Sequence, residues 1–189
     1  MTKEREQFEE MFALIAKDPF SWLEHAQTMR AAAQPVLQSL LGILHEPQTR
    51  PGVRLQKLAY VRGYMLLTGF AFENLLKAIA AKCNLLRVDP GTAHKATPKL
   101  TFDARLSARK GRHSLTRFAR DLGLALPEEE MQYLKRLEEY IHWGGRYPVP
   151  MKADVYAASY SAMRLSFATA YPKLGDALFD KLVSHHFGG

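Results

Sequence analysis

Three side chains in the sequence are candidates for acid–base chemistry on a charged substrate: Glu73, His113 and Arg146. An imidazole exchanges protons near neutral pH, so His113 is the candidate general base. A guanidinium stabilises the negative charge that develops in a transition state, which is the role expected of Arg146. Glu73 falls on an apolar helical stripe, where a carboxylate needs a cationic partner or takes up a proton. We therefore predict that Glu73 orients one of the other two groups.

Each of these candidates also has a structural interpretation. Lys77 follows Glu73 by one helical turn, so the two can form a structural ion pair. His113 can act as a capping histidine that bonds the backbone. Arg146 lies on a proline-braced strap whose neighbouring aromatic residues can form a structural clamp. The sequence leaves both interpretations open for all three candidates.

The positive charge of the chain is concentrated between Lys82 and Arg120. This segment contains ten lysines and arginines and two acids, a charge of +8, whereas the whole chain carries +7. A local positive field attracts phosphates. We predict a phosphate- or RNA-binding set in this segment, made of Arg105, Arg109, Lys110, Arg112 and Arg117. Ser114 begins a helix whose free N–H groups can also receive an anion. The alternative is a solvated loop that binds no partner.

The sequence gives only weak signals for a metal or a cofactor. Glu139 and His142 have the Glu-x-x-His spacing of di-iron bundles, but such bundles need a second copy and two further glutamates. The sequence contains no phosphate-binding glycine loop, no Gly-x-Ser-x-Gly and no His-Glu-x-x-His. We therefore expect neither a metal nor a cofactor.

The composition is that of an ordinary folded domain. The chain has 189 residues, of which 47% are hydrophobic and 24% are charged. Its one cysteine, Cys83, permits no intramolecular disulfide, which fits a reducing compartment. The charged N-terminus lacks the apolar region of a signal peptide, and charged residues interrupt the most apolar stretch, Tyr64 to Ala81. We expect a soluble, cytoplasmic protein.

Apolar residues recur at helical spacing over most of the chain, which predicts an all-α bundle of about five to seven helices. The same pattern predicts no sheet of more than two short strands. The central helix, about Val53 to Asn84, is apolar nearly all round and should pack on more than one side. Pro35 should kink or split the helix that runs from Pro19 to about Leu44. Residues 85–112 look irregular because they contain prolines and glycines. The other predicted helices cover residues 3–16, Ser114–Leu122, a stretch from Pro127 to Gly144-Gly145, Ala153–Tyr171 and Lys173–His186.

Three segments resemble motifs of the HEPN superfamily of helical proteins. They are Gly69–Ala78 (GFAFENLLKA), His113–Leu115 (HSL) and Trp143–Pro148 (WGGRYP). Their order along the chain matches as well as their composition, and the resemblance covers roughly residues 55 to 150. It implies one domain, 1–189, that consists of N-terminal helices 1–52, a HEPN-like core 53–150 and C-terminal helices 151–189.

The resemblance also implies a function. Many HEPN proteins are metal-independent ribonucleases of toxin–antitoxin and phage-defence systems, others bind nucleotides or are non-catalytic modules, and dimers are common. The implied partners are RNA or a nucleotide, a second copy of the chain, and an antitoxin or other protein.

The nuclease members carry an arginine followed, after four to six residues, by a histidine, and this sequence departs from that pattern. Three residues separate Arg109 from His113, seven separate Arg105 from His113, and Arg146 has no histidine in range. Three functions stay open: an RNA- or nucleotide-binding domain with ribonuclease activity, a non-catalytic interaction module, and a sensor of a small anionic ligand.

Overall fold

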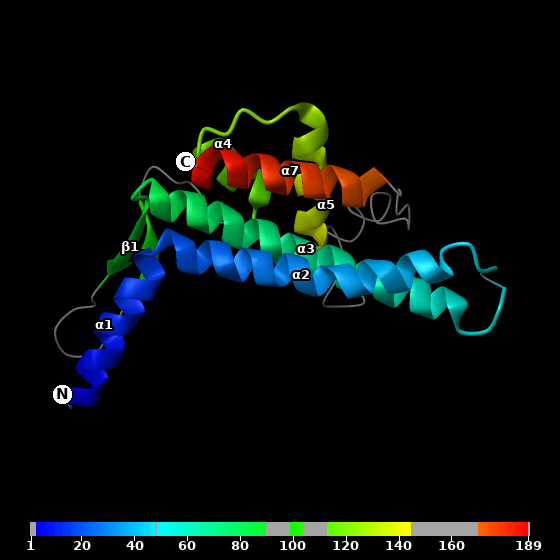
Figure 1. The fold of residues 1–189 in the computed structure, drawn as a ribbon, viewed down its shortest axis with the longest axis horizontal. Coiled ribbons are helices and arrows are strands. Elements are labelled where there is room, and N and C mark those ends of the chain that lie inside the picture. Colours follow the sequence, from blue (N-terminus) through cyan, green and yellow to red (C-terminus); the bar gives the residue numbers. More distant parts are fainter. Residues whose placement is uncertain (1–2, 48, 90–98, 104–112, 145–169, 189) are drawn as a thin grey trace.

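A computed structural model describes residues 3–47, 49–89, 99–103, 113–144 and 170–188. It confirms an all-α helical bundle with one small two-stranded sheet (Figure 1). The elements in chain order are α1 (Lys3–Lys17), α2 (Pro19–Ile43), α3 (Val53–Lys82), β1 (Leu86–Asp89), β2 (Lys99–Phe102), α4 (Leu115–Asp121), α5 (Glu128–Glu139), the π-helix η2 (Tyr140–Gly144) and α7 (Ala170–Phe187).

The two longest helices, α2 and α3, lie side by side in opposite directions and form the base of the bundle (Figure 1). Asp18 begins α2, because its carboxylate accepts hydrogen bonds from the backbone N–H groups of Phe20 and Ser21. The sequence predicts that Pro35 kinks or splits this helix, and the split does not occur, since α2 is continuous from Pro19 to Ile43. A helix tolerates an internal proline when tertiary packing compensates for the lost bond, and here Ala33 and Leu37 on either side are buried.

The centre of the fold is α3, as its apolar sequence predicted. Its buried residues lie all round the helix, because α2, α4, α5, η2 and α7 all contact it. Phe72 meets Tyr133 of α5 and Phe179 of α7 edge to face, with ring centroids 5.9 Å and 5.6 Å apart. A Cβ atom on Gly69 would lie 2.6 Å from Cγ1 of Ile141, so a glycine is required where η2 crosses α3.

The prediction of an irregular stretch after α3 needs correction. Asn84 adopts a left-handed conformation and ends the helix, and β1 then pairs with β2 as antiparallel strands. Leu86 is opposite Phe102 in the register, and Leu86 is buried against the bundle. β1 packs beside α1, which projects from the rest of the bundle (Figure 1).

The remaining described helices agree with their predicted positions within a few residues. α4 ends at Gly123, which has a positive φ of 70°, and α5 follows Pro127. α7 begins at Ala170, slightly before the predicted start, while the helix predicted over 153–171 falls largely outside the described residues. None of the helices in the described ranges combines the length and apolarity that a membrane crossing requires.

Candidate functional site

Glu73 lies in the middle of α3 with only 6% of its surface exposed. Both of its carboxylate oxygens have cationic or titratable partners. Lys77 Nζ lies 2.7 Å from Oε1, and Nδ1 of His113 lies 3.0 Å from Oε2. The structure thus combines the two interpretations of Glu73, as part of an ion pair and as a residue that orients His113.

The ion pair with Lys77 follows from helix geometry, because residues four apart lie on the same face. The Lys77 side chain is 18% exposed, and its ammonium group lies 5.2 Å from the ring centroid of Trp22 in α2. A cation in this position gains both Coulomb attraction and a cation–π contact. Lys77 therefore compensates the charge of Glu73 and leaves the second carboxylate oxygen available to His113.

His113 lies immediately before α4, on the turn that brings the chain back to α3. Its Nδ1 faces Glu73, while its side chain remains 38% exposed. When a neutral imidazole donates its Nδ1–H to a carboxylate, Nε2 is the unprotonated nitrogen. This arrangement fixes the tautomer and leaves an accepting nitrogen on a partly solvent-accessible ring.

A second imidazole lies next to His113. His142, in η2, makes an edge-to-face contact with it, with ring centroids 5.9 Å apart. Partial burial lowers the pKa of His142 below its ordinary value, and the neighbouring His113 lowers it further, against the opposing effect of Glu138. Partial burial thus favours the uncharged form of His142.

Sequence reasoning considered His142 only as a metal ligand and missed this contact. The available signal was the spacing of Glu138 and His142, which are four residues apart in the helix predicted from Pro127 to Gly144-Gly145 and so on one predicted face. That face is the one turned toward α4. Among the described residues, there is no cluster of three or more histidine, cysteine or acidic side chains suited to a metal ion.

The start of α4 already has an anionic partner from the chain itself. Oε1 of Glu138 accepts hydrogen bonds from Thr116 N at 2.5 Å, Thr116 Oγ1 at 2.7 Å and Ser114 Oγ at 3.1 Å. Ser114 thus occupies the predicted N-cap position, but its hydroxyl donates to Glu138 instead of capping the backbone. The prediction that this helix start presents free N–H groups to a phosphate is wrong for Thr116.

Replacing Glu138 by alanine should destabilise the protein by about 1–2 kcal/mol, the cost of losing a helix cap that serves several donors. The backbone N–H of Thr116 would lose its partner, and the turn that carries His113 would loosen. Chemical denaturation measures the change, with Lys135→Ala on the exposed side of α5 as the control. Equal stability of the two variants would mean that Glu138 does not anchor α4.

The other predicted site residues are placed only in part. Arg117 is exposed on α4. Arg105, Arg109, Lys110, Arg112 and Arg146 lie outside the described residues, so the predicted contact of Glu73 with Arg146 stays a prediction. The structure therefore brings together Glu73 and His113, two of the three catalytic candidates, and adds Lys77 and His142.

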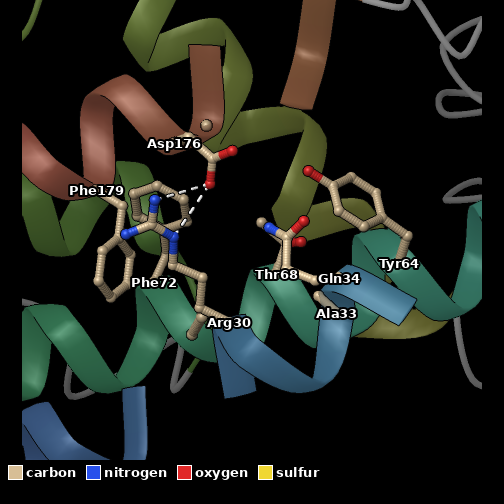
Figure 2. Close-up of a pocket in the computed structure, with 10 residues that line it drawn as sticks. Arg30, Ala33, Gln34, Tyr64, Thr68, Phe72, Asp176 and Phe179 are labelled. Carbon is tan, nitrogen blue, oxygen red and sulfur yellow. Dashed lines mark hydrogen bonds and ion pairs between the residues drawn. The ribbon is translucent and has the colours of Figure 1, made fainter. Parts of the chain in front are cut away.

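A separate pocket lies between α2, α3 and α7 (Figure 2). Arg30 and Asp176 lie at one side of it, and Thr68, Gln34 and Tyr64 at the other. Arg30 is paired with Asp176 at 2.9 Å and also with Asp180, so a small anion would meet two carboxylates beside the guanidinium. The pocket has room for about one water molecule, and it does not favour the sensor of an anionic ligand.

The Glu73–His113 pair with its two neighbours is therefore the candidate site. A buried carboxylate orients a partly exposed imidazole, a lysine balances the carboxylate, and a second imidazole, that of His142, lies alongside. Such a group can move a proton and needs no metal to do so. Comparisons with models of protein families, with curated proteins and with solved structures give no match to this chain.

Proposed function

We propose that this chain is a HEPN-like domain that binds RNA or a nucleotide and cleaves RNA without a metal, within a defence or toxin–antitoxin system. The observation that carries the proposal is the 3.0 Å contact between Nδ1 of His113 and the buried carboxylate of Glu73. A carboxylate–imidazole pair with a partly exposed ring is the arrangement that a general base requires.

The reaction uses this pair directly. Nε2 of His113 takes the proton from a ribose 2′-hydroxyl, and the 2′ oxygen attacks the neighbouring phosphorus. The P–O5′ bond breaks and the leaving oxygen takes a proton from water, and the hydroxide that remains takes the proton from the imidazolium of His113. Glu73 stabilises the imidazolium that forms, because its charge lies against the protonated ring. Arg146 or Arg112 is the proposed cation for the phosphorane, since a guanidinium matches the geometry of phosphate oxygens.

The charge of the chain supports a polyanionic ligand. The segment from Lys82 to Arg120, which carries +8, includes His113. A positive field around the general base would concentrate RNA where the reaction occurs. Inside the same segment, Asp103 pairs with Arg87 at 2.7 Å and so neutralises one of the ten cations.

The alternative is a non-catalytic interaction module. The observation that favours it is the set of large apolar side chains exposed along α1, which are described below. The two functions can be told apart by RNA binding. An RNA-binding protein binds RNA with an affinity that falls as the salt concentration rises, whereas an apolar docking module has no such salt-dependent affinity for RNA.

The test is the binding of a labelled single-stranded RNA in EDTA over a series of salt concentrations. We expect log affinity to fall linearly with log salt, by about 0.7 for each phosphate neutralised. Reversal of Arg109, Lys110 and Arg112 to glutamate should remove most of the affinity and reduce the slope by about 2.

The control reverses Lys17, Arg54 and Lys135, which are exposed outside the basic segment, and so makes the same change in net charge. It should retain the slope of the wild type. Equal weakening by both triple variants would contradict a specific site in the basic segment. Wild-type protein whose RNA affinity does not change with salt would reject the RNA-binding function and favour the interaction module.

A further inference from the structure

The helix α1 exposes a continuous apolar face. Six large side chains on it and at the start of α2 have between 42% and 72% of their surface exposed: Phe8, Met11, Phe12, Leu14, Ile15 and Phe20. Four of them, Phe8, Met11, Phe12 and Ile15, follow the spacing i, i+3, i+4 and i+7 of one helical stripe. Figure 1 shows α1 extending away from the other helices, and the four side chains of this stripe are between 42% and 61% exposed.

The orientation of α1 is opposite to that of an ordinary surface helix. The least exposed residues of α1 are not its large apolar ones: Ala16 is buried, and Ala13 and Glu9 are half-buried. The large apolar side chains point away from the bundle. A soluble monomer rarely exposes a contiguous apolar patch of this kind, and such patches mark interaction sites.

The exposed area of the stripe is a large share of one side of a dimer interface. With about 150–250 Å² for an aromatic side chain and similar values for the aliphatic ones, its four residues expose roughly 400 Å² together. A standard interface buries about 800 Å² on each partner, of which the apolar core is the larger part. The stripe therefore supplies about half of one such surface.

The charges of α1 discriminate between partners. The helix contains four glutamates against two lysines and one arginine, so an anionic membrane surface would repel it. A partner must therefore be an apolar protein surface. Two antiparallel copies of α1 also align their helix dipoles favourably, whereas parallel copies would bring the acidic first turns together.

The sequence of α1 is self-complementary in an antiparallel register centred between Met11 and Phe12. In that register Met11 of one copy is opposite Phe12 of the other, and Phe8 is opposite Ile15. Each large residue of the stripe thus faces another large residue, which a two-fold axis requires of both partners at once.

We infer that α1 is a dimerisation helix, which pairs with α1 of a second copy of this chain in antiparallel orientation through Phe8, Met11, Phe12 and Ile15. This interface does not involve Glu73 or His113, so the inference stands apart from the proposed ribonuclease function. The partner of the α1 surface is then the same apolar stripe of a second copy, and the two-fold axis passes between Met11 and Phe12.

The first test measures the mass of the protein in solution by light scattering at micromolar concentration. Wild type should have about twice the chain mass of 21.4 kDa. The variant Phe8→Glu/Ile15→Glu should have the mass of one chain, because it places four charges in the apolar interface. The control Leu41→Glu/Leu55→Glu changes two exposed leucines near the α2–α3 turn and should remain a dimer.

Circular dichroism should give the same helical content for all three proteins, which separates dissociation from unfolding. A monomeric wild type would overturn the inference. A dimer that survives in the α1 variant but dissociates in the Leu41/Leu55 variant would place the interface on the other end of the bundle and overturn it as well.

The second test fixes the orientation by disulfide cross-linking, in a Cys83→Ser background because Cys83 is exposed. Met11→Cys lies beside the proposed two-fold axis and should form a covalent dimer on oxidation. Phe8→Cys should not, since its copy lies about 10 Å further along the helix axis in the antiparallel register. Cross-linking of both variants would indicate parallel helices and overturn the proposed register.

Discussion

Replacing Glu73 by glutamine is expected to destabilise the protein by about 3 kcal/mol, the lower end of the cost of breaking a buried ion pair. Glutamine keeps the shape of the side chain but removes the charge, so the Lys77 ammonium loses its carboxylate partner 2.7 Å away. The lower value applies because 18% of the Lys77 side chain can still meet water. For a chain of this length the melting temperature should fall by about 6–12 °C.

A double-mutant cycle separates the pair from the individual residues. Lys77→Met should also destabilise, because it leaves the buried carboxylate with His113 alone. The double variant Glu73→Gln/Lys77→Met should lose less than the sum of the single variants, with an interaction term above about 1 kcal/mol. Additive losses would show that the two charges do not interact in the folded protein.

The control for this cycle is an ion pair with the same spacing on the surface. Glu46 and Arg50 are also four residues apart and lie 2.9 Å from each other, but both are exposed. Glu46→Gln should cost less than about 1 kcal/mol, because solvent screens an exposed pair. The comparison isolates burial as the cause of the effect at Glu73.

The periodicity of the sequence was enough to predict the helices, because their apolar residues recur over many turns. Burial of Glu73 and its pairing with Lys77 were predictable for the same reason, since both follow from helix spacing within α3. The strands β1 and β2 were missed because each has four residues, too few for an alternating pattern to stand out. Pro35 does not split α2 because packing around the helix compensates for the lost backbone hydrogen bond.

The parts of the site that escaped prediction are contacts between distant segments. The hydrogen bonds from Ser114 and Thr116 to Glu138 span more than twenty residues, and the contact of His113 with His142 spans a similar distance. Neither follows from local spacing, because it depends on how α5 crosses α4. The chemistry of the two side chains was enough to suggest that Glu73 orients His113. The distance between them could be known only from the fold, because forty residues separate them along the chain.

Cleavage of single-stranded RNA should fall by about 10²–10⁴-fold in His113→Ala, the contribution typical of a general base. RNA affinity should stay at its wild-type value, because a general base acts in the reaction step and phosphate contacts act in both the ground state and the transition state. The measurement is a single-turnover rate in EDTA, at saturating protein, together with a separate binding titration.

The control is His45→Ala, which removes an exposed imidazole at the end of α2 and should cleave at the wild-type rate. Glu73→Gln should also slow cleavage, because an amide can accept from Nδ1–H but cannot stabilise an imidazolium by charge. The cleavage rate of Glu73→Gln is measured at a temperature at which circular dichroism shows that this variant is still folded. If His113→Ala cleaves RNA as fast as His45→Ala does, His113 is not the base. The Glu73–His113 contact would then have a structural role, with the imidazole anchoring the start of α4 to the middle of α3.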